Sequence, residues 1–375
     1  MYDYKNIFVS MLSLSILSSS SFHFYASSGE EDDGFFAIFP EDYYEPNDYS
    51  DQSFSNELND NGNDGFIIES EDILNGENAE NLNFIAAGDY KCNKESSKTV
   101  KNILNFDPEL VIGLGDYIFE NTSADCWFDL SEPINAIMRI AIGNHDLDYS
   151  SSYQQLISHY GLEKPYYSFN FRNIHFLAIS SEHPFEKGSA QYDFIRADLE
   201  RTSQDPNILW KFVYLHKPFY TASDFDENSS KDLRKALQKL FENNGVDIVL
   251  SGHTQYYQRS LPLTYNKDDS SYPLVVNRDS NSYKNNDGII FITAGTGGDD
   301  LHKIDSYLPY TVIQKREHGF LNFDIKDNGN TLIGTFFDNK NLDILDRFVI
   351  NKGDFGDKYS QINISSNPEK YYYAQ

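Results

Sequence analysis

The sequence has only two cysteines among its 375 residues, Cys92 and Cys126. A disulfide-dense scaffold, which stabilises small domains that lack a large core, is therefore excluded. At most one bridge can form, and it persists only in an oxidising compartment. Because 39% of the residues are hydrophobic and 15% are aromatic, apolar packing rather than cross-linking must stabilise the fold.

Basic residues are also scarce. The 30 Lys and Arg residues stand against 58 Asp and Glu residues, which gives a formal net charge of −28. Such a chain repels nucleic acids and anionic membrane surfaces, so we expect no nucleic-acid partner. A phosphorylated substrate would also be repelled unless its site supplies local positive charge, and bound metal ions can supply that charge.

No apolar run is long enough to be a clear membrane span. The apolar stretch at residues 7–17, which follows Lys5, is about half the length that a span requires. Together with the small residues around Ala26, it resembles a secretory signal peptide covering residues 1–27. We therefore expect an exported protein, located in the extracellular space or the cell envelope. The alternative is an uncleaved N-terminal anchor, which would be the only membrane attachment.

The next segment, residues 28–80, has little apolar surface to bury. It is rich in Asp, Glu, Asn, Ser and Gly, as in EEDDG and NELNDNGNDG, and this composition predicts a disordered acidic linker. The stretch DNGNDG superficially resembles a calcium-binding loop, but it lacks the glutamate that such a loop needs at its later position. Residues 351–375 are expected to form a loosely ordered tail, which leaves residues 81–350 for the folded domain.

Within residues 81–350, short apolar runs alternate with amphipathic stretches. The runs LNFIAAGD, ELVIGLGD, NIHFLAIS, ILWKFVYLHKP, VDIVLSGH and GIIFITAG are typical of buried strands. Between them, SSKTVKNILNF, QYDFIRADLERTS and SKDLRKALQKLFENNG have the spacing of helices. This alternation predicts an α/β fold. Near the end, GFLNFDI and TLIGTFFD flank KDNGN, which predicts a hairpin.

Polar residues follow the predicted strands at the point where each strand ends. They are Asp89, Asp116, the triplet Asn144-His145-Asp146, His216 and His253. In open α/β sheets, ligands bind at the carboxyl edge of the strands, so a sheet can bring these residues together. A single histidine at such a place is usually structural. Carboxylate, amide and imidazole groups together suit a divalent metal such as Mn, Fe(II) or Zn.

The order of these motifs resembles the calcineurin-like metallophosphoesterases, and within them the purple acid phosphatase branch. IAAGDYKCN is similar to the GDxGC motif of that branch, GLGDYIFE to GDxxY, and AIGNHD to GNH[DE]. VYLHKPFY resembles the strand that ends in a histidine, and SGHTQYYQRS resembles GHxHxYxR. The resemblance covers roughly residues 82–350. It implies a four-layer αββα sandwich, in which two mixed sheets are flanked by helices, with two metals at the strand ends.

The resemblance also implies ligands for the metals. Asp116 would bridge both ions, Asn144, His216 and His253 would complete the second metal site, and Asp89 would belong to the first. The expected reaction is metal-dependent hydrolysis of a phosphomonoester or phosphodiester by metal-activated water.

Two further residues acquire roles from the resemblance. His145 would hydrogen-bond the substrate and protonate the leaving oxygen as a general acid, while Asp146 would hold the imidazole in place.

Three positions depart from the family pattern, and all three affect the first metal site. Lys91 stands where the family commonly has Gly or His, Phe119 replaces a metal-binding Tyr, and Gln255 replaces the second His of GHxH. We therefore expect one tightly bound metal and hypothesise that the Lys91 ammonium partly neutralises Asp89 and Asp116, or contacts the substrate phosphate. The alternative for Lys91 is a side chain in solvent. Gln255 offers an amide oxygen, a weaker ligand for transition metals.

The missing ligands leave two alternatives to hydrolysis. The chain could be a pseudoenzyme that binds phosphate or metal, or an exported interaction module that keeps the fold. The retained His145 and the intact second site favour the hydrolase.

Two smaller features complete the site prediction. Cys92 and Cys126 follow the first and second Gly-Asp turns, so if those strands are neighbours, an exported protein should join them in a disulfide. The alternative is two buried free thiols. Asp299, Asp300 and His302 follow the turn GTGG, and they either face the site or belong to a polar surface loop.

Overall fold

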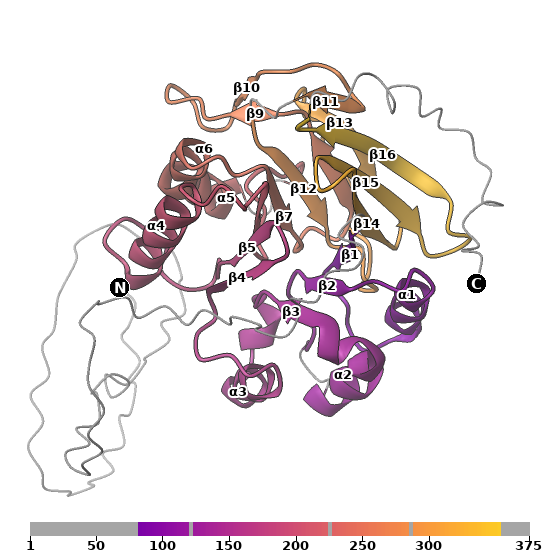
Figure 1. Ribbon diagram of the computed structural model, residues 1–375. Coiled ribbons are helices and arrows are strands. Elements are labelled where there is room, and N and C mark those ends of the chain that lie inside the picture. The colour runs from indigo at the N-terminus through magenta and orange to yellow at the C-terminus, as the bar shows by residue number, and fades with distance from the viewer. Residues whose placement is uncertain (1–81, 120–122, 224–226, 285–287, 354–375) are drawn as a thin grey trace, which may run out of the picture. The chain divides into compact units, whose positions relative to one another are not determined.

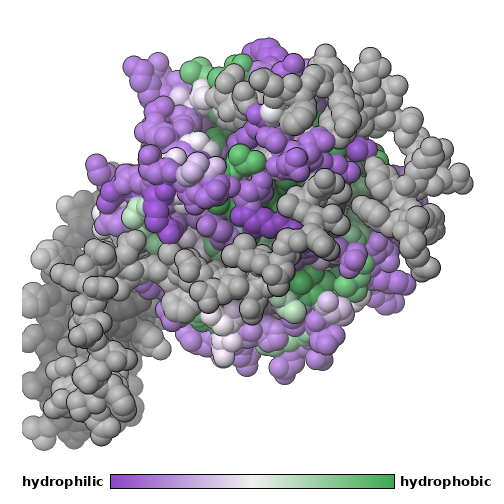
Figure 2. Space-filling model, viewed as in Figure 1, coloured by the Kyte–Doolittle hydropathy of each residue, from purple (hydrophilic) through white to green (hydrophobic). Residues whose placement is uncertain are grey.

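The computed structural model describes residues 82–119, 123–223, 227–284 and 288–353 (Figure 1). The predicted signal peptide or anchor (1–27), the acidic linker (28–80) and all but the start of the predicted tail (351–375) lie outside the described residues. Among the described helices, none combines the length and the hydrophobicity that crossing a membrane requires. The coloured residues on the face seen in Figure 2 are largely hydrophilic, as the charge content predicts.

Two seven-stranded sheets form the centre of the domain. In spatial order, the first sheet contains β11 (Ser282–Lys284), β16 (Ile344–Asn351), β15 (Thr331–Asp338), β14 (Gly319–Lys326), β1 (Leu82–Ala87), β2 (Leu110–Gly113) and β3 (Met138–Ile140). The second contains β13 (Thr311–Lys315), β8 (Tyr257–Ser260), β12 (Ile290–Ala294), β7 (Ile248–Ser251), β6 (Trp210–Tyr214), β5 (Ile174–Ala178) and β4 (Tyr167–Phe171). The two-residue strands β9 (Leu263–Thr264) and β10 (Leu274–Val275) form a separate ribbon.

Both sheets are mixed, and their parallel parts carry the predicted site. In the first sheet β1, β2 and β3 run parallel, and in the second β5, β6, β7 and β12 do. The predicted hairpin is present as the antiparallel pair β14 and β15. The carboxyl ends of the parallel strands therefore lie along one edge of each sheet.

Helices cover the outer face of each sheet (Figure 1). The first sheet packs against α1 (Lys94–Leu104), α2 (Ala124–Ser131) and α3 (Ser150–His159), and the second against α4 (Ala190–Thr202), α5 (Glu227–Leu233) and α6 (Lys239–Asn243). A π-helical turn (Arg234–Gln238) joins α5 to α6, and two 3₁₀ turns, η1 (Glu132–Ile137) and η2 (His145–Leu147), flank β3. Helix α1 begins after Asn93, whose side chain accepts a hydrogen bond from the backbone of Ser96 and caps the helix.

The alternation of side chains along β1 explains the layers. Phe84 and Ala86 point between the sheets, whereas Ile85 and Ala87 point to the helices of the first sheet. Between the sheets, the Phe84 ring lies 5.2 Å from the Phe212 ring and 4.7 Å from the Phe323 ring, centroid to centroid. The four-layer αββα arrangement predicted from the sequence is confirmed.

A buried ion pair also joins the two sheets. Arg259 on β8 donates to both carboxylate oxygens of Asp346 on β16, at 2.6 and 2.9 Å, and Tyr257 donates to the same carboxylate. The Arg259 side chain is fully buried, so its charge depends on Asp346 for compensation. Arg259, the last residue of the GHxHxYxR-like motif, therefore connects the sheets.

We predict that Asp346→Ala lowers the free energy of unfolding by about 3–5 kcal/mol, because the Arg259 charge would remain buried without its partner. Urea denaturation measures this loss. Asp343→Ala removes an exposed carboxylate three residues away and should change stability by about 0.5 kcal/mol or less. A loss for Asp346→Ala as small as that of the control would contradict the structural role of the pair.

Candidate metal centre

The predicted polar residues follow the ends of five strands. Asp89 follows β1, Asp116 follows β2 and Asn144 follows β3, while His216 follows β6 and His253 follows β7. Asp89, Asp116 and His253 have left-handed backbones, with φ values of 60°, 57° and 69°. Such conformations are costly for residues other than glycine and persist where the surrounding structure fixes them, often at functional sites.

The glycines of the motifs allow the polar side chains to approach the backbone. A Cβ atom on Gly143 would lie 2.2 Å from Asp116 Oδ1, and one on Gly252 would lie 2.5 Å from Asp89 Oδ2. Both contacts are closer than real Cβ atoms come, so only glycine fits before Asn144 and before His253.

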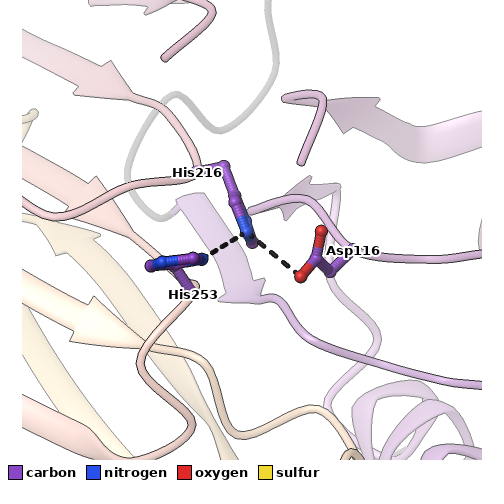
Figure 3. A group of neighbouring side chains, drawn as sticks. All are labelled: Asp116, His216 and His253. Atoms are coloured by element: carbon purple, nitrogen blue, oxygen red, sulfur yellow. Dashed lines mark hydrogen bonds and ion pairs between the residues drawn. The ribbon is translucent and has the colours of Figure 1, made fainter. Parts of the chain in front are cut away.

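Four side chains converge on one point (Figure 3 shows three of them). The Nε2 atom of His216 lies 3.2 Å from Asp116 Oδ2, 3.1 Å from Asn144 Oδ1 and 3.1 Å from His253 Nδ1. The other ring nitrogen of His216 donates to the Leu114 carbonyl at 2.8 Å. That bond aims Nε2 at the other donors, which is the usual way a metal-binding histidine is oriented. Among the described residues, Asp116, His216 and His253 form a buried group that could hold a metal.

The charges in this group are strongly coupled. Burial alone disfavours a charged His216, but the carboxylates of Asp116 and Asp89 outweigh it and raise the pKa of His216 above its usual range. Burial, followed by the charge on His216, lowers the pKa of His253 to about 2. Burial would raise the pKa of Asp116, yet His216 holds it below its usual value. Without a metal, one proton on His216 therefore takes the place of a cation between these ligands.

This arrangement predicts that metal binding at pH 7 releases about one proton, because the metal must displace the proton on His216 Nε2. Since the pKa of His216 is raised, the site is protonated at neutral pH, and metal affinity should increase about tenfold per pH unit. Calorimetry in two buffers with different ionisation enthalpies counts the released protons. Binding without proton release would contradict the protonated His216.

His145 stands beside this group and faces solvent. Its backbone N–H donates to Asp116 Oδ1 at 3.0 Å, its ring stacks on Phe119, and its side chain is 39% exposed. Its Nδ1 atom lies 2.9 Å from the carboxylate of Asp148. Asp148, rather than the predicted Asp146, therefore holds this imidazole, and the prediction for Asp146 is wrong.

Asp146 has a different role. Its carboxylate is fully buried and accepts four backbone N–H groups, those of Gly143, Asp116, Tyr117 and Ile118, at 2.8–3.0 Å. The four backbone N–H groups occupy all four acceptor positions of the carboxylate, so none remains for the His145 ring. Asp146 ties the loop after β2 to the loop after β3 and holds Asp116 and Asn144 in register.

The first metal position is poorer in ligands. Asp89 is fully buried, with one carboxylate oxygen accepting the His253 N–H at 2.8 Å. The aromatic ring of Phe119 offers no ligand atom, and the Gln255 amide is buried. Among the described residues, Asp89 Oδ1 and Gln255 Oε1 have no hydrogen-bond partner.

The hypothesis that Lys91 neutralises Asp89 and Asp116 needs correction. Its Nζ lies 2.8 Å from Asp299 Oδ1 and 3.4 Å from Asp300 Oδ2. The backbone at Lys91 is left-handed, with φ of 55°, and the side chain runs to the loop after β12. Lys91 therefore compensates a carboxylate next to the site.

Asp299 is the residue whose role the sequence left open. It is 6% exposed, and its backbone N–H donates to the Asp89 carbonyl at 2.8 Å. Of its neighbours after GTGG, Asp300 and His302 are exposed, although the His302 backbone N–H donates to the Gln255 carbonyl. Only its place after a glycine-rich turn distinguished Asp299 in the sequence.

Cys92 and Cys126 form a disulfide, with 6.1 Å between their Cα atoms. Strands β1 and β2 are neighbours, as this pairing requires. The bridge connects the loop that follows Asp89 to helix α2.

Two mixed sheets with a carboxylate, an amide and two imidazoles at the strand ends define a metal-dependent phosphoesterase architecture. Residues 82–257 match the model of the calcineurin-like phosphoesterase family. This segment, a little under half of the chain, is similar to that family, and the sequence relatives of the chain support the purple acid phosphatase-like branch.

Comparisons with individual proteins agree with this assignment. The chain is 25% identical to purple acid phosphatase 22 of Arabidopsis thaliana over 58% of this chain and 50% of that protein. It is 23% identical to a nucleotide pyrophosphatase/phosphodiesterase of Hordeum vulgare over 73% of this chain and 79% of that protein. The purple acid phosphatase PPD1 of yellow lupin (Lupinus luteus) has the same fold, with a TM-score of 0.63 and 22% identity over 73% of this chain and 54% of that one. The chain spans about half the length of the first Arabidopsis relatives that it matches.

The family binds a dinuclear metal centre, and the donors in this chain fit its two positions unequally. At the second position, three ligand atoms from Asp116, Asn144 and His253 lie 3.1–3.2 Å from a fourth, His216 Nε2. The first position lacks both the tyrosinate and the imidazole of the purple acid phosphatase pattern, so it does not fit a transition metal of that kind.

Proposed function

We propose that the protein hydrolyses phosphate esters, either monoesters or diesters, with a divalent metal held by Asp116, Asn144, His216 and His253. The observation that supports this proposal is the meeting of these four side chains around His216 Nε2. Mn, Fe or Zn suits this set of nitrogen and oxygen donors. When bound, such a metal supplies Lewis-acid polarisation of the phosphate and makes water a stronger nucleophile at neutral pH.

The groups around His145 position its ring for proton transfer to the leaving oxygen. Asp148 lies 2.9 Å from His145 Nδ1 and accepts its N–H, which leaves Nε2 as the nitrogen that can protonate the leaving oxygen. Stacking on Phe119 limits the ring's motion, and the bond from the His145 backbone to Asp116 ties it to the metal ligands. His145 thus has the position and the exposure that a general acid requires.

Reconstitution tests the proposal. Protein stripped of metal by a chelator should not hydrolyse a generic aryl phosphate, and adding Mn²⁺, Zn²⁺ or Fe²⁺ should restore turnover. Stripped protein that regains its metal but never turns over the ester would contradict hydrolysis.

That negative result would favour the second candidate, a pseudoenzyme that binds metal or phosphate. The loss of ligands at the first position supports this candidate. So does the 25% identity to a probable inactive purple acid phosphatase 27 of Arabidopsis thaliana, over 63% of this chain and 42% of that protein. The retained His145, with its partner Asp148, favours the enzyme.

We also propose that the protein is exported. The disulfide between Cys92 and Cys126 supports this location, because such bridges persist in oxidising compartments. Fractionation of cells with an antibody to the folded domain tests it, and recovery of the protein only from the cytosol would contradict it.

A further inference from the structure

Two of the three departures from the family pattern, Lys91 and Gln255, contact Asp299, and the third, Phe119, lies beside Lys91. Lys91 Nζ lies 2.8 Å from one oxygen of this carboxylate, and Gln255 Nε2 donates to the other at 3.0 Å. The same lysine ammonium lies 5.6 Å from the centre of the Phe119 ring. The substitutions therefore form one connected unit.

Asp299 is well fixed within this unit. Its backbone N–H donates to the Asp89 carbonyl, and its own carbonyl oxygen accepts from His318 Nε2 at 2.8 Å. Its side chain is 8% exposed, in contrast to 99% for that of Asp300. Because hydrogen bonds hold both the N–H and the carbonyl of Asp299, its carboxylate is fixed and can orient a side chain that donates to it.

The orientation of Gln255 follows from that contact. Because an ionised carboxylate only accepts hydrogen bonds, the NH₂ end of the amide faces Asp299 and the oxygen faces away from it. This oxygen is buried without a partner among the described residues, as is Asp89 Oδ1. Both residues are bonded to Asp299, Asp89 through its main-chain carbonyl and Gln255 through its amide N–H, and two buried oxygens without partners are costly unless a further group binds them.

The charge at this position indicates which group that is. Asp89 and Asp116 are buried, and the buried Asp299 holds Gln255, whereas Lys91 is the one lysine or arginine paired with these carboxylates in the described part of the chain. An anion would be repelled there. Carboxylate and amide oxygens without nitrogen or sulfur donors suit hard cations such as Mg²⁺.

We propose that the first position is an oxygen-only cation site that takes a hard divalent cation, Mg²⁺, through Asp89, Asp116 and Gln255. Asp299 is a positioning residue that aims the Gln255 oxygen, and the Lys91 ammonium forms an ion pair with Asp299. The protein would then hold two unlike metals, one at the imidazole-rich position and Mg²⁺ at this one. The inference rests on the proposed function, since it assumes that the second position is a metal site.

Calorimetric titration of the zinc-loaded protein with Mg²⁺, without substrate, tests the proposal. We expect one Mg²⁺ to bind per chain, and we expect Asp299→Asn to weaken its affinity by about 10–100-fold, the usual effect of removing a residue that orients a ligand. Asp300→Asn is the matched control. It removes the neighbouring exposed carboxylate and should leave the affinity within about twofold, since a single exposed charge contributes little.

Gln255→His gives a second readout. In the Gln255→His variant, the introduced imidazole should weaken Mg²⁺ binding and allow a second equivalent of Zn²⁺ to bind. No Mg²⁺ binding to the wild-type protein, two equally tight Zn²⁺ ions in it, or an unchanged Mg²⁺ affinity in Asp299→Asn or Gln255→His would each overturn the proposal.

Binding of the first Zn²⁺ equivalent is measured in every variant and shows that the fold and the second position are intact. If wild-type protein binds that first equivalent but no Mg²⁺, the inference fails while hydrolysis with one metal stands. If it binds no Zn²⁺ at all, the proposed function fails.

Discussion

His253→Ala protein should lose its tightly bound metal and, with it, the hydrolysis of phosphate esters. His253 supplies one of only two imidazoles in the buried group, and its Nδ1 lies 3.1 Å from His216 Nε2. Residues that merely orient a ligand change metal affinity by about 10–100-fold, so removal of the ligand itself should cost at least about 100-fold. Metal analysis after gel filtration, together with an aryl phosphate assay, measures both losses.

A histidine elsewhere in the domain provides the control for this experiment. His159 is exposed on α3, where its ring stacks on Phe128, and it is not among the predicted ligands. His159→Ala should therefore retain the wild-type metal content and rate. Unchanged metal stoichiometry in His253→Ala would contradict the assignment of the ligands.

His145→Ala should have the second large effect, and on rate alone. If His145 protonates the leaving oxygen, its removal should lower turnover by about 10²–10⁴-fold. Metal content should stay unchanged, because the imidazole is bound by Asp148 and stacked on Phe119 rather than directed at the metal ligands. Steady-state kinetics and metal analysis of the same preparation separate the two effects. A fully active His145→Ala protein would remove this residue from the mechanism.

Asp148 provides an internal check on the same step. Asp148→Asn keeps the size of the side chain but replaces the charged carboxylate that accepts from His145 with a neutral amide oxygen. It should therefore lower turnover less than His145→Ala does. In the double variant, the two changes should not add, because Asp148 acts through His145. Additive losses would assign Asp148 a separate role.

The sequence predicted that the proposed ligands follow strand ends, and the structure places them there because strands constrain their positions. Each predicted ligand follows a short apolar run, and parallel strands bring their carboxyl ends to one edge. The glycines that precede Asp116 and Asn144 are part of the same sequence pattern, because those turns leave no room for a Cβ atom. The alternation of strands and helices predicted only an α/β fold, and the four layers followed from the family resemblance; the two faces of β1 show how the layers form.

The contacts made by loop side chains could not be predicted in this way. Asp146 and Asp148 both lie within three residues of His145, and only the 3₁₀ turn at η2 determines that Asp146 points inward and Asp148 reaches the ring. Lys91 has a left-handed backbone, and its partner Asp299 lies more than 200 residues later in the chain. Sequence spacing carries no information on such long-range pairs.

The central claim is that Asp116, Asn144, His216 and His253 hold one metal. Crystals of the protein grown with Zn²⁺ and measured on both sides of the zinc absorption edge test it most directly. We expect one strong anomalous peak within coordination distance of the Asp116 carboxylate, the Asn144 amide oxygen, His216 Nε2 and His253 Nδ1. Zinc bound elsewhere in the domain, with no peak between these four atoms, would contradict it.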